Sequence, residues 1–207
     1  MNKRYTLSVL LSSALILLIS LGCSSVPETR YYTIGKIVPE AGAFGQKLEK
    51  SVGVPQFEAE GIYSRDNLLY RRGNYEIAAD YYRLWGLPPQ KMLAEATVHY
   101  LRKSGLFTQV RRMPTMSRTD LVLAGRIIRL EETAGPTGPA VALELEYSLQ
   151  CAKTSQQLWW KEVSATSPIT AAQSADAVVV AVENCVRACL DQAVRSLAEA
   201  SAELGSK

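Results

Sequence analysis

The clearest pattern of apolar and polar positions in the chain is an alternation in its second half. Residues of one parity are apolar, and the residues between them are small or polar. The apolar set is Val141, Leu143, Leu145, Tyr147, Leu149 and Cys151, and the intervening set is Ala142, Glu144, Glu146, Ser148 and Gln150. Successive side chains of a strand point to opposite faces, so this pattern predicts a strand with one buried face and one wet face.

Neighbouring segments predict two further strands, which together with the first form a meander. Asp120 to Leu130 is apolar at both parities, so we expect both of its faces to be covered. Gln157 to Ala165, which contains two tryptophans, is the third strand, and Pro168 is expected to break it. The segment from Gly135 to Pro139 is rich in Gly and Pro and predicts the turn between the first two strands.

Two helices are predicted from apolar residues spaced three and four positions apart. The first extends from Pro89 to Ser104, with proline at a position that needs no amide donor and Gly105 as the C-terminal cap. The second extends from Ala172 to Leu204. Its apolar stripe consists of Val178, Val182, Cys185, Val186, Cys189, Ala193 and Leu197. This stripe is interpreted as core, with a homo-oligomer interface as the alternative.

The part of the chain before the first helix predicts shorter strands. Tyr31 to Ile34 and Val52 to Pro55 are rich in aromatic and β-branched residues, and Asn67 to Tyr82 reads as a hairpin around Gly73-Asn74. The expected fold is therefore α+β, a mostly antiparallel sheet with two main helices packed on it, in a single domain over residues 31–207.

The N-terminus has the layout of a secretory signal that ends at a cysteine. Lys3 and Arg4 precede an uncharged apolar run from Tyr5 to Leu21. Gly22 is small enough to admit a protease, and the Cys23 thiolate can form a thioether to a lipid. An uncleaved membrane helix is the alternative, because the run approaches the roughly 18 to 20 residues that span a bilayer.

These residues resemble a bacterial lipobox. The resemblance implies a signal peptide over residues 1–22, cleavage between Gly22 and Cys23, and a lipidated tether over residues 23–30, with palmitate among the expected acyl groups. Ser24 stands where an aspartate would favour retention in the inner membrane. The resemblance therefore favours a lipid anchor in the outer membrane, with the protein facing the periplasm.

The charge balance excludes one class of partner. Two of the 23 basic residues, Lys3 and Arg4, lie in the signal, which leaves 21 against 20 acidic residues in the mature chain. Proteins that bind nucleic acid normally carry a basic stripe, so no nucleic-acid partner is expected.

Cysteine and histidine usage gives no catalytic or metal site. Beyond Cys23 the chain has Cys151, Cys185 and Cys189. Cys185 and Cys189 share a helix face and are not an easy disulfide pair, whereas Cys151 could bridge to either. The alternative, that all three cysteines are small apolar core residues without a disulfide, is equally open. His99 is the only histidine, and no nucleophile motif accompanies it, so we expect no enzyme, cofactor or metal.

An aromatic cluster follows the hairpin, at Tyr81, Tyr82, Arg83 and Trp85. It is interpreted either as core or as a partner-binding surface, because Tyr, Trp and Arg dominate binding hot spots. The sequence leaves both interpretations open.

The order of the motifs is similar to that of a known family. After the lipobox come Tyr31-Tyr32-Thr33-Ile34, Val52-Gly53-Val54-Pro55, Tyr70-Arg71, Arg83-Leu84-Trp85, a helix and Gly105-Leu106-Phe107. This order resembles the ABC-type transport auxiliary lipoproteins, the PqiC-like family. The resemblance implies that the protein acts together with a mammalian-cell-entry-type transport protein and an ABC transporter, which move lipid between the inner and outer membranes. The alternative is a periplasmic carrier that holds an acyl chain between the sheet and the 172–204 helix.

Overall fold

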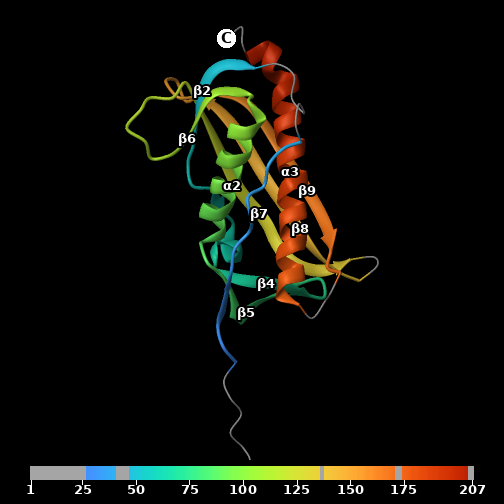
Figure 1. Cartoon of the computed structure of the whole chain (residues 1–207). Helices are drawn as coiled ribbons and strands as arrows, with labels where there is room; N and C mark the ends of the chain where they lie inside the picture. Colours follow the sequence, from blue (N-terminus) through green and yellow to red (C-terminus); the bar gives the residue numbers. More distant parts are fainter. Residues whose placement is uncertain (1–26, 41–46, 136–137, 171–173, 205–207) are drawn as a thin grey trace, which may run out of the picture.

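The protein is described by a computed structural model over residues 27–40, 47–135, 138–170 and 174–204. The expected signal peptide, Gly22, Cys23 and the expected helix start at Ala172 lie outside the described residues. The elements are β1 Arg30–Tyr32, β2 Leu48–Val54, β3 Glu58–Ala59, η1 Gly61–Ser64, β4 Asn67–Arg72, β5 Glu76–Trp85, α2 Pro89–Ser104, β6 Phe107–Arg112, β7 Leu121–Gly135, β8 Gly138–Cys151, β9 Gln157–Pro168 and α3 Ala175–Leu204. Figure 1 shows α2 and α3 lying over a curled sheet.

The two helices cover the same face of the sheet, and β8 demonstrates it. Thr97 of α2 lies within hydrogen-bonding distance of the Tyr147 hydroxyl, and Cys185 of α3 contacts the carbonyl of Val141. The predicted apolar parity of β8 is buried from Val141 to Leu149, which confirms the alternation. Cys151, at the end of the strand, is only half-buried.

In β7 one face is buried more completely than the other. Leu121, Leu123 and Ile127 are buried, whereas Val122 and Ala124 are half-buried, so the expectation of two covered faces is wrong for this part of the strand. The ladder with β8 shifts register between Ile127 and Arg129, so one extra residue changes which parity faces the helices. That shift is why Leu130 is buried again.

The sheet is mixed, which corrects the expectation of a mostly antiparallel one. Among the described strands, β1–β5, β2–β6, β2–β7, β3–β7 and β4–β7 pair in parallel, and β4–β5, β7–β8 and β8–β9 pair antiparallel. The parallel pairs join segments that are distant in the chain. For example, β6 returns beside β2 only after the hairpin and α2, and such crossovers produce parallel neighbours.

Both predicted helices are present. α2 has the predicted bounds, Pro89 to Ser104, and Gly105 caps it with a left-handed φ of 70°. α3 ends at Leu204 as predicted but begins at Ala175, because Ser174 lies outside the helix. The predicted stripe of α3 is buried from Val178 to Leu197, which confirms it as core. β9 continues past its predicted end to Pro168, because it pairs only with β8 in the described sheet and its other edge needs no amide donor.

Candidate functional site

A bulge in β5 carries most of the residues predicted to bind a partner. The β4–β5 ladder pairs Asn67 with Leu84 and then Leu69 with Ala79. Between these pairs β4 has only Leu68, whereas β5 has the four residues from Asp80 to Arg83. Bulges of this kind redirect side chains and are frequent near functional sites.

The Asp80 carboxylate holds the bulge together. Its Oδ1 atom accepts the backbone amides of Tyr82 and Arg83 at 2.8 and 2.9 Å, and its Oδ2 atom accepts Arg83 Nε at 2.7 Å. Asn67 Nδ2 donates to the Asp80 carbonyl at 2.8 Å. Burial alone would raise the pKa of Asp80, but these hydrogen bonds outweigh it and lower the pKa below its ordinary value.

The four predicted partner-binding residues divide into two groups. Tyr81 is 83% exposed and Tyr82 38% exposed, on the bulge itself. Trp85 is only 5% exposed and belongs to the core, with its backbone amide donated to the Asp66 carbonyl at 2.6 Å. Arg83 lies half-buried beneath the bulge, with its Nη2 atom 3.1 Å from Glu132 Oε1. Trp85 is therefore a core residue, and the exposed members of the group are Tyr81 and Tyr82.

Exposed tyrosines gather around this bulge. Among the described residues, the exposed tyrosines are Tyr31 on β1, Tyr75 in the β4–β5 turn, and Tyr81 and Tyr82 on β5. We call these four residues the tyrosine end. Figure 1 shows that β4 and β5 lie at the end of the molecule where the described chain begins. Tyr75, Tyr81 and Tyr82 are close in the chain, but Tyr31 lies 44 residues before Tyr75 and reaches this hairpin only because β1 pairs with β5.

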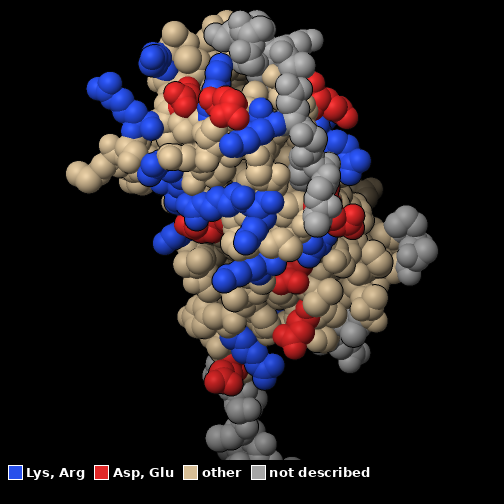
Figure 2. All heavy atoms as spheres, turned by 45° about the horizontal axis from the view of Figure 1, so that its top comes forward, with Lys and Arg blue, Asp and Glu red and all other residues tan. Residues whose placement is uncertain are grey.

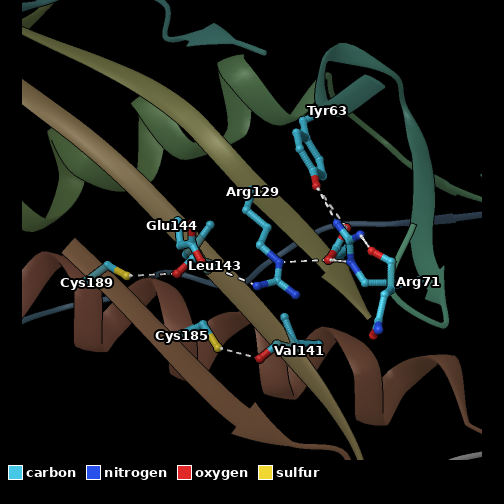
Figure 3. Close-up of polar contacts among 10 residues, drawn as sticks. Tyr63, Arg71, Arg129, Val141, Leu143, Glu144, Cys185 and Cys189 are labelled. Atoms are coloured by element: carbon cyan, nitrogen blue, oxygen red, sulfur yellow. Dashed lines mark hydrogen bonds and ion pairs between the residues drawn. The ribbon is translucent and has the colours of Figure 1, made fainter. Parts of the chain in front are cut away.

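A buried carboxylate lies on the sheet beside this hairpin. Glu131 of β7 is 2% exposed. It accepts hydrogen bonds from Arg71 Nε at 2.5 Å, from Arg129 Nε at 2.7 Å and from the Tyr63 hydroxyl at 2.9 Å. Figure 3 shows these donors converging from different elements. The cluster joins η1, β4 and β7, and sequence reasoning missed it.

The interface between the sheet and α3 is well packed. Two apolar cavities lie there, each of about 10 Å³, one beside Trp85 and Val182 and the other beside Tyr147 and Leu197. A volume of that size holds about one water molecule. Both cavities are therefore too small for an acyl chain.

Two of the cysteines are buried thiols on α3. Cys185 and Cys189 point at the carbonyls of Val141 and Leu143 of β8, as Figure 3 shows. Burial raises the pKa of Cys185 to about 11 and that of Cys189 to about 12. Cys151 lies eight residues beyond Leu143 on the same strand, about 26 Å away at 3.3 Å per residue. These three cysteines are therefore free, and the interpretation of all three as core residues holds for Cys185 and Cys189 but not for the half-buried Cys151.

His99 has a structural contact. Its Nδ1 atom lies 3.2 Å from the carbonyl of Ile37, in the segment after β1. The same segment is held by Glu183, which accepts the Gly35 amide at 2.5 Å, and by Arg187, which donates to the Val38 carbonyl at 2.9 Å. His99 thus helps fasten the N-terminal segment across the two helices. Over the described ranges, the structure contains no group of three residues suited to a metal.

The exposed face of α2 is basic. α2 exposes Lys91, Arg102 and Lys103 against one acid, Glu95, whereas α3 exposes Arg187 and Arg195 against Asp176 and Glu199. Figure 2 shows Lys and Arg side chains forming a band across the middle of the face that it views. The near balance of charges in the sequence therefore conceals a local asymmetry.

Comparison with known proteins identifies the family of the chain. A model of the ABC-type transport auxiliary lipoprotein component matches residues 32–194. The chain belongs to this family. As an ABC-type transport auxiliary lipoprotein it is membrane-associated, and its family is one of transport components.

Solved structures agree on the fold of this auxiliary lipoprotein. A Xanthomonas campestris protein is 19% identical, with 86% of this chain and 100% of that one covered at a TM-score of 0.76. An uncharacterised protein is 14% identical, with 87% and 98% covered at 0.58. No curated protein sequence matches the chain. Among the described residues, no helix has the length and apolar character to cross a bilayer.

Proposed function

We propose that the protein is an outer-membrane lipoprotein that acts as the auxiliary component of an ABC transport system of the mammalian-cell-entry type, which moves lipid between membranes. The observation that carries the proposal is the family match over residues 32–194. In this role the protein docks the transport conduit at the membrane. Its partners are the mammalian-cell-entry-type transport protein and the components of the ABC transporter.

The anchor in this proposal is Cys23. Cleavage after Gly22 would leave residues 23–30 as a lipidated tether and residues 31–207 as the folded domain. The lipobox-like residues around Cys23 and the lipoprotein character of the family support it. A single acyl chain binds membranes only marginally, but several chains on one cysteine anchor stably. Ser24 supports the outer membrane as the destination.

The tyrosine end is the surface that we propose for contact at the membrane, with either the bilayer or the transport proteins. Tyr81 and Tyr82 are its exposed members on β5, next to the half-buried Arg83, whereas Trp85 is buried in the core. The bulge that presents the tyrosines is held by Asp80, so the surface is pre-ordered before it meets a partner. Ordering a surface in advance reduces the entropic cost of binding.

The carrier function is less well supported than docking. A carrier needs an apolar cavity for an acyl chain, and the two apolar cavities between α3 and the sheet measure about 10 Å³ each. The larger open groove between β9 and α3, of about 450 Å³, is lined by charged and polar side chains such as Lys161, Asp191 and Arg195. A docking module needs a membrane anchor and a contact surface, and the proposal assigns these to Cys23 and to the tyrosine end. Native mass spectrometry of the purified protein discriminates the two, because a carrier would retain lipid beyond the covalent anchor.

The experiment that tests the anchor follows radiolabelled palmitate into the protein. The natural chain is expected to incorporate label and to fractionate with the outer membrane, whereas Cys23→Ala loses the label and is not cleaved. Cys151→Ala is the matched control, since it removes a different cysteine and should incorporate label normally. Label in Cys23→Ala would contradict the assignment of the anchor.

The partner is tested separately by mild crosslinking in membranes, followed by purification of the acylated protein. Recovery of a mammalian-cell-entry-type protein or an ABC transporter subunit is the expected result. Consistent recovery of neither, with the protein acylated and folded, would overturn the transport role and leave the anchor standing.

A further inference from the structure

We infer that the tyrosine end lies against the headgroup layer of the lipid bilayer that holds the anchor. This inference rests on the proposed anchoring at Cys23 and names the partner of the tyrosine end. The contact would fix how the domain stands on the membrane, and it would direct the opposite end of the molecule away from the bilayer.

The first argument is reach. Only seven peptide units separate Cys23 from Arg30, where β1 begins, and an extended chain spans at most about 25 Å over that length. Tyr31 is the next residue, and β1 pairs with β5 at Arg83 to Trp85. Tyr75 and Tyr81 are six residues apart on the hairpin, about 20 Å at 3.3 Å per residue. The whole tyrosine end is therefore within reach of the membrane surface.

The second argument is composition. Tyr31, Tyr75 and Tyr81 are 69%, 96% and 83% exposed, whereas the described tyrosines elsewhere in the chain are buried or half-buried. A tyrosine has an apolar ring and a polar hydroxyl, so it suits a layer that is apolar on one side and wet on the other. Exposed rings confined to one end of the fold are thus accounted for by a membrane interface.

The third argument is charge. The exposed charges on β1 and the residues just before it, on the hairpin and on the turn before the hairpin are mixed in sign: Arg30, Arg65 and Arg72 against Glu28, Asp66 and Glu76. Such a surface has little net attraction for anionic lipid, so the contact should depend on the rings. It should persist in vesicles of zwitterionic lipid alone and change little with salt. The basic face of α2 would behave oppositely if that face were the one on the membrane.

The test places a single tryptophan at three exposed positions of the full, acylated protein. Tyr81→Trp reports on the tyrosine end, Lys103→Trp on the basic face of α2, and Met116→Trp on the loop after β6. Each site is exposed, so the fold should tolerate the substitution. The variants are reconstituted in phosphatidylcholine vesicles with or without lipid brominated on its acyl chains near the headgroups, which quenches nearby tryptophan. Trp85, Trp159 and Trp160 give the same background in all three.

The expected result is loss of the added emission of Tyr81→Trp in brominated vesicles, with the added emission of Lys103→Trp and Met116→Trp retained. Tyr75→Trp is a second reporter that should behave like Tyr81→Trp. Equal quenching at all three positions, or quenching of Lys103→Trp alone, would overturn the inference. So would an unquenched Tyr81→Trp whose position crosslinks instead to a protein partner.

Flotation of the vesicles distinguishes failure of the proposed anchor from failure of the inferred contact of the tyrosine end. Protein that fails to float has no working anchor, and both the proposed anchoring and the inference then fall. Protein that floats with an unquenched tyrosine end keeps the anchor and loses only the inference.

Discussion

Glu131 and Glu132 are consecutive residues of β7, and their surroundings shift their pKa values in opposite directions. Burial would raise the pKa of Glu131, but hydrogen bonds from Arg71, Tyr63 and Arg129 lower it. Burial raises the pKa of Glu132, Asp80 adds to the increase, and the charge of Arg83 opposes it without cancelling it. The ion pair of Glu132 with Arg83 at 3.1 Å lacks the geometry of a hydrogen bond. The charged form of Glu131 therefore stabilises the folded protein, whereas the charged form of Glu132 destabilises it.

Replacing Glu131 is expected to destabilise the protein. Glu131→Gln removes the negative charge that Arg71 and Arg129 share, which leaves two arginines without their main partner. Their side chains are 23% and 28% exposed, so water compensates in part, and we expect a loss of about 2 kcal/mol rather than the larger cost of a fully buried pair. Urea unfolding at pH 7 measures it. Glu144→Gln is the control, because that pair with Arg129 is 3.4 Å long and should cost below about 1 kcal/mol.

The loss from Glu131→Gln should disappear in acid. A carboxyl with a lowered pKa contributes stability above its unfolded pKa, near 4.3, and loses it as the pH falls through the lower folded pKa. The unfolding free energies of the natural protein and the variant are therefore expected to converge below about pH 4. A difference that stays constant down to pH 3 would mean that Glu131 acts through shape and not through charge.

Glu132→Gln should have the opposite pH dependence. A carboxyl whose folded pKa is raised costs stability once the pH exceeds its unfolded pKa, so the natural protein loses stability between the unfolded and folded pKa values of Glu132. Glutamine resembles the neutral form, and the variant is expected to be at least as stable as the natural protein at pH 7. Thermal unfolding across pH 4 to 8 measures the effect, and a variant that is clearly less stable at pH 7 would contradict it.

The three thiols of the domain are expected to differ in reactivity. Hydrogen bonds from Thr154 lower the pKa of Cys151, whereas burial raises the pKa of Cys185 and of Cys189. The thiolate is the reactive form, so a disulfide reagent at neutral pH should modify one thiol quickly and the other two only after unfolding. Mass spectrometry after a short exposure identifies the modified residue. Cys151→Ala should abolish the fast reaction, and a fast reaction that survives would show that α3 opens readily.

The sequence predicted the elements whose local pattern is regular, and it failed where distant segments decide the outcome. The alternation of β8 and the spacing in α2 and α3 gave burial correctly, because each follows from the geometry of one element. The parallel pairing of β2 with β6 and β7 has no local signal. The register shift after Ile127 is one residue long and has no local signal either, although it decides that Leu130 lies on the side covered by the helices. The split between exposed Tyr81 and buried Trp85 likewise depends on a bulge that only the β4 pairing defines.

Asp80 is expected to control the order of the tyrosine end more than the stability of the fold. Asp80→Ala removes the acceptor of the Tyr82 and Arg83 amides and of Arg83 Nε, so the bulge loses the bonds that close it. These bonds lie at the surface of one hairpin, and the global cost should be about 1 to 2 kcal/mol. The amides of Tyr82 and Arg83 should then exchange with solvent much faster, while those of α3 change little. Hydrogen exchange followed by NMR measures both rates.

Glu76→Ala is the matched control. It removes an ion pair with Arg72 in which both side chains are 61% exposed, so the bulge should stay closed in this variant. Unchanged exchange at Tyr82 and Arg83 in Asp80→Ala would mean that the β4 pairing alone shapes the bulge.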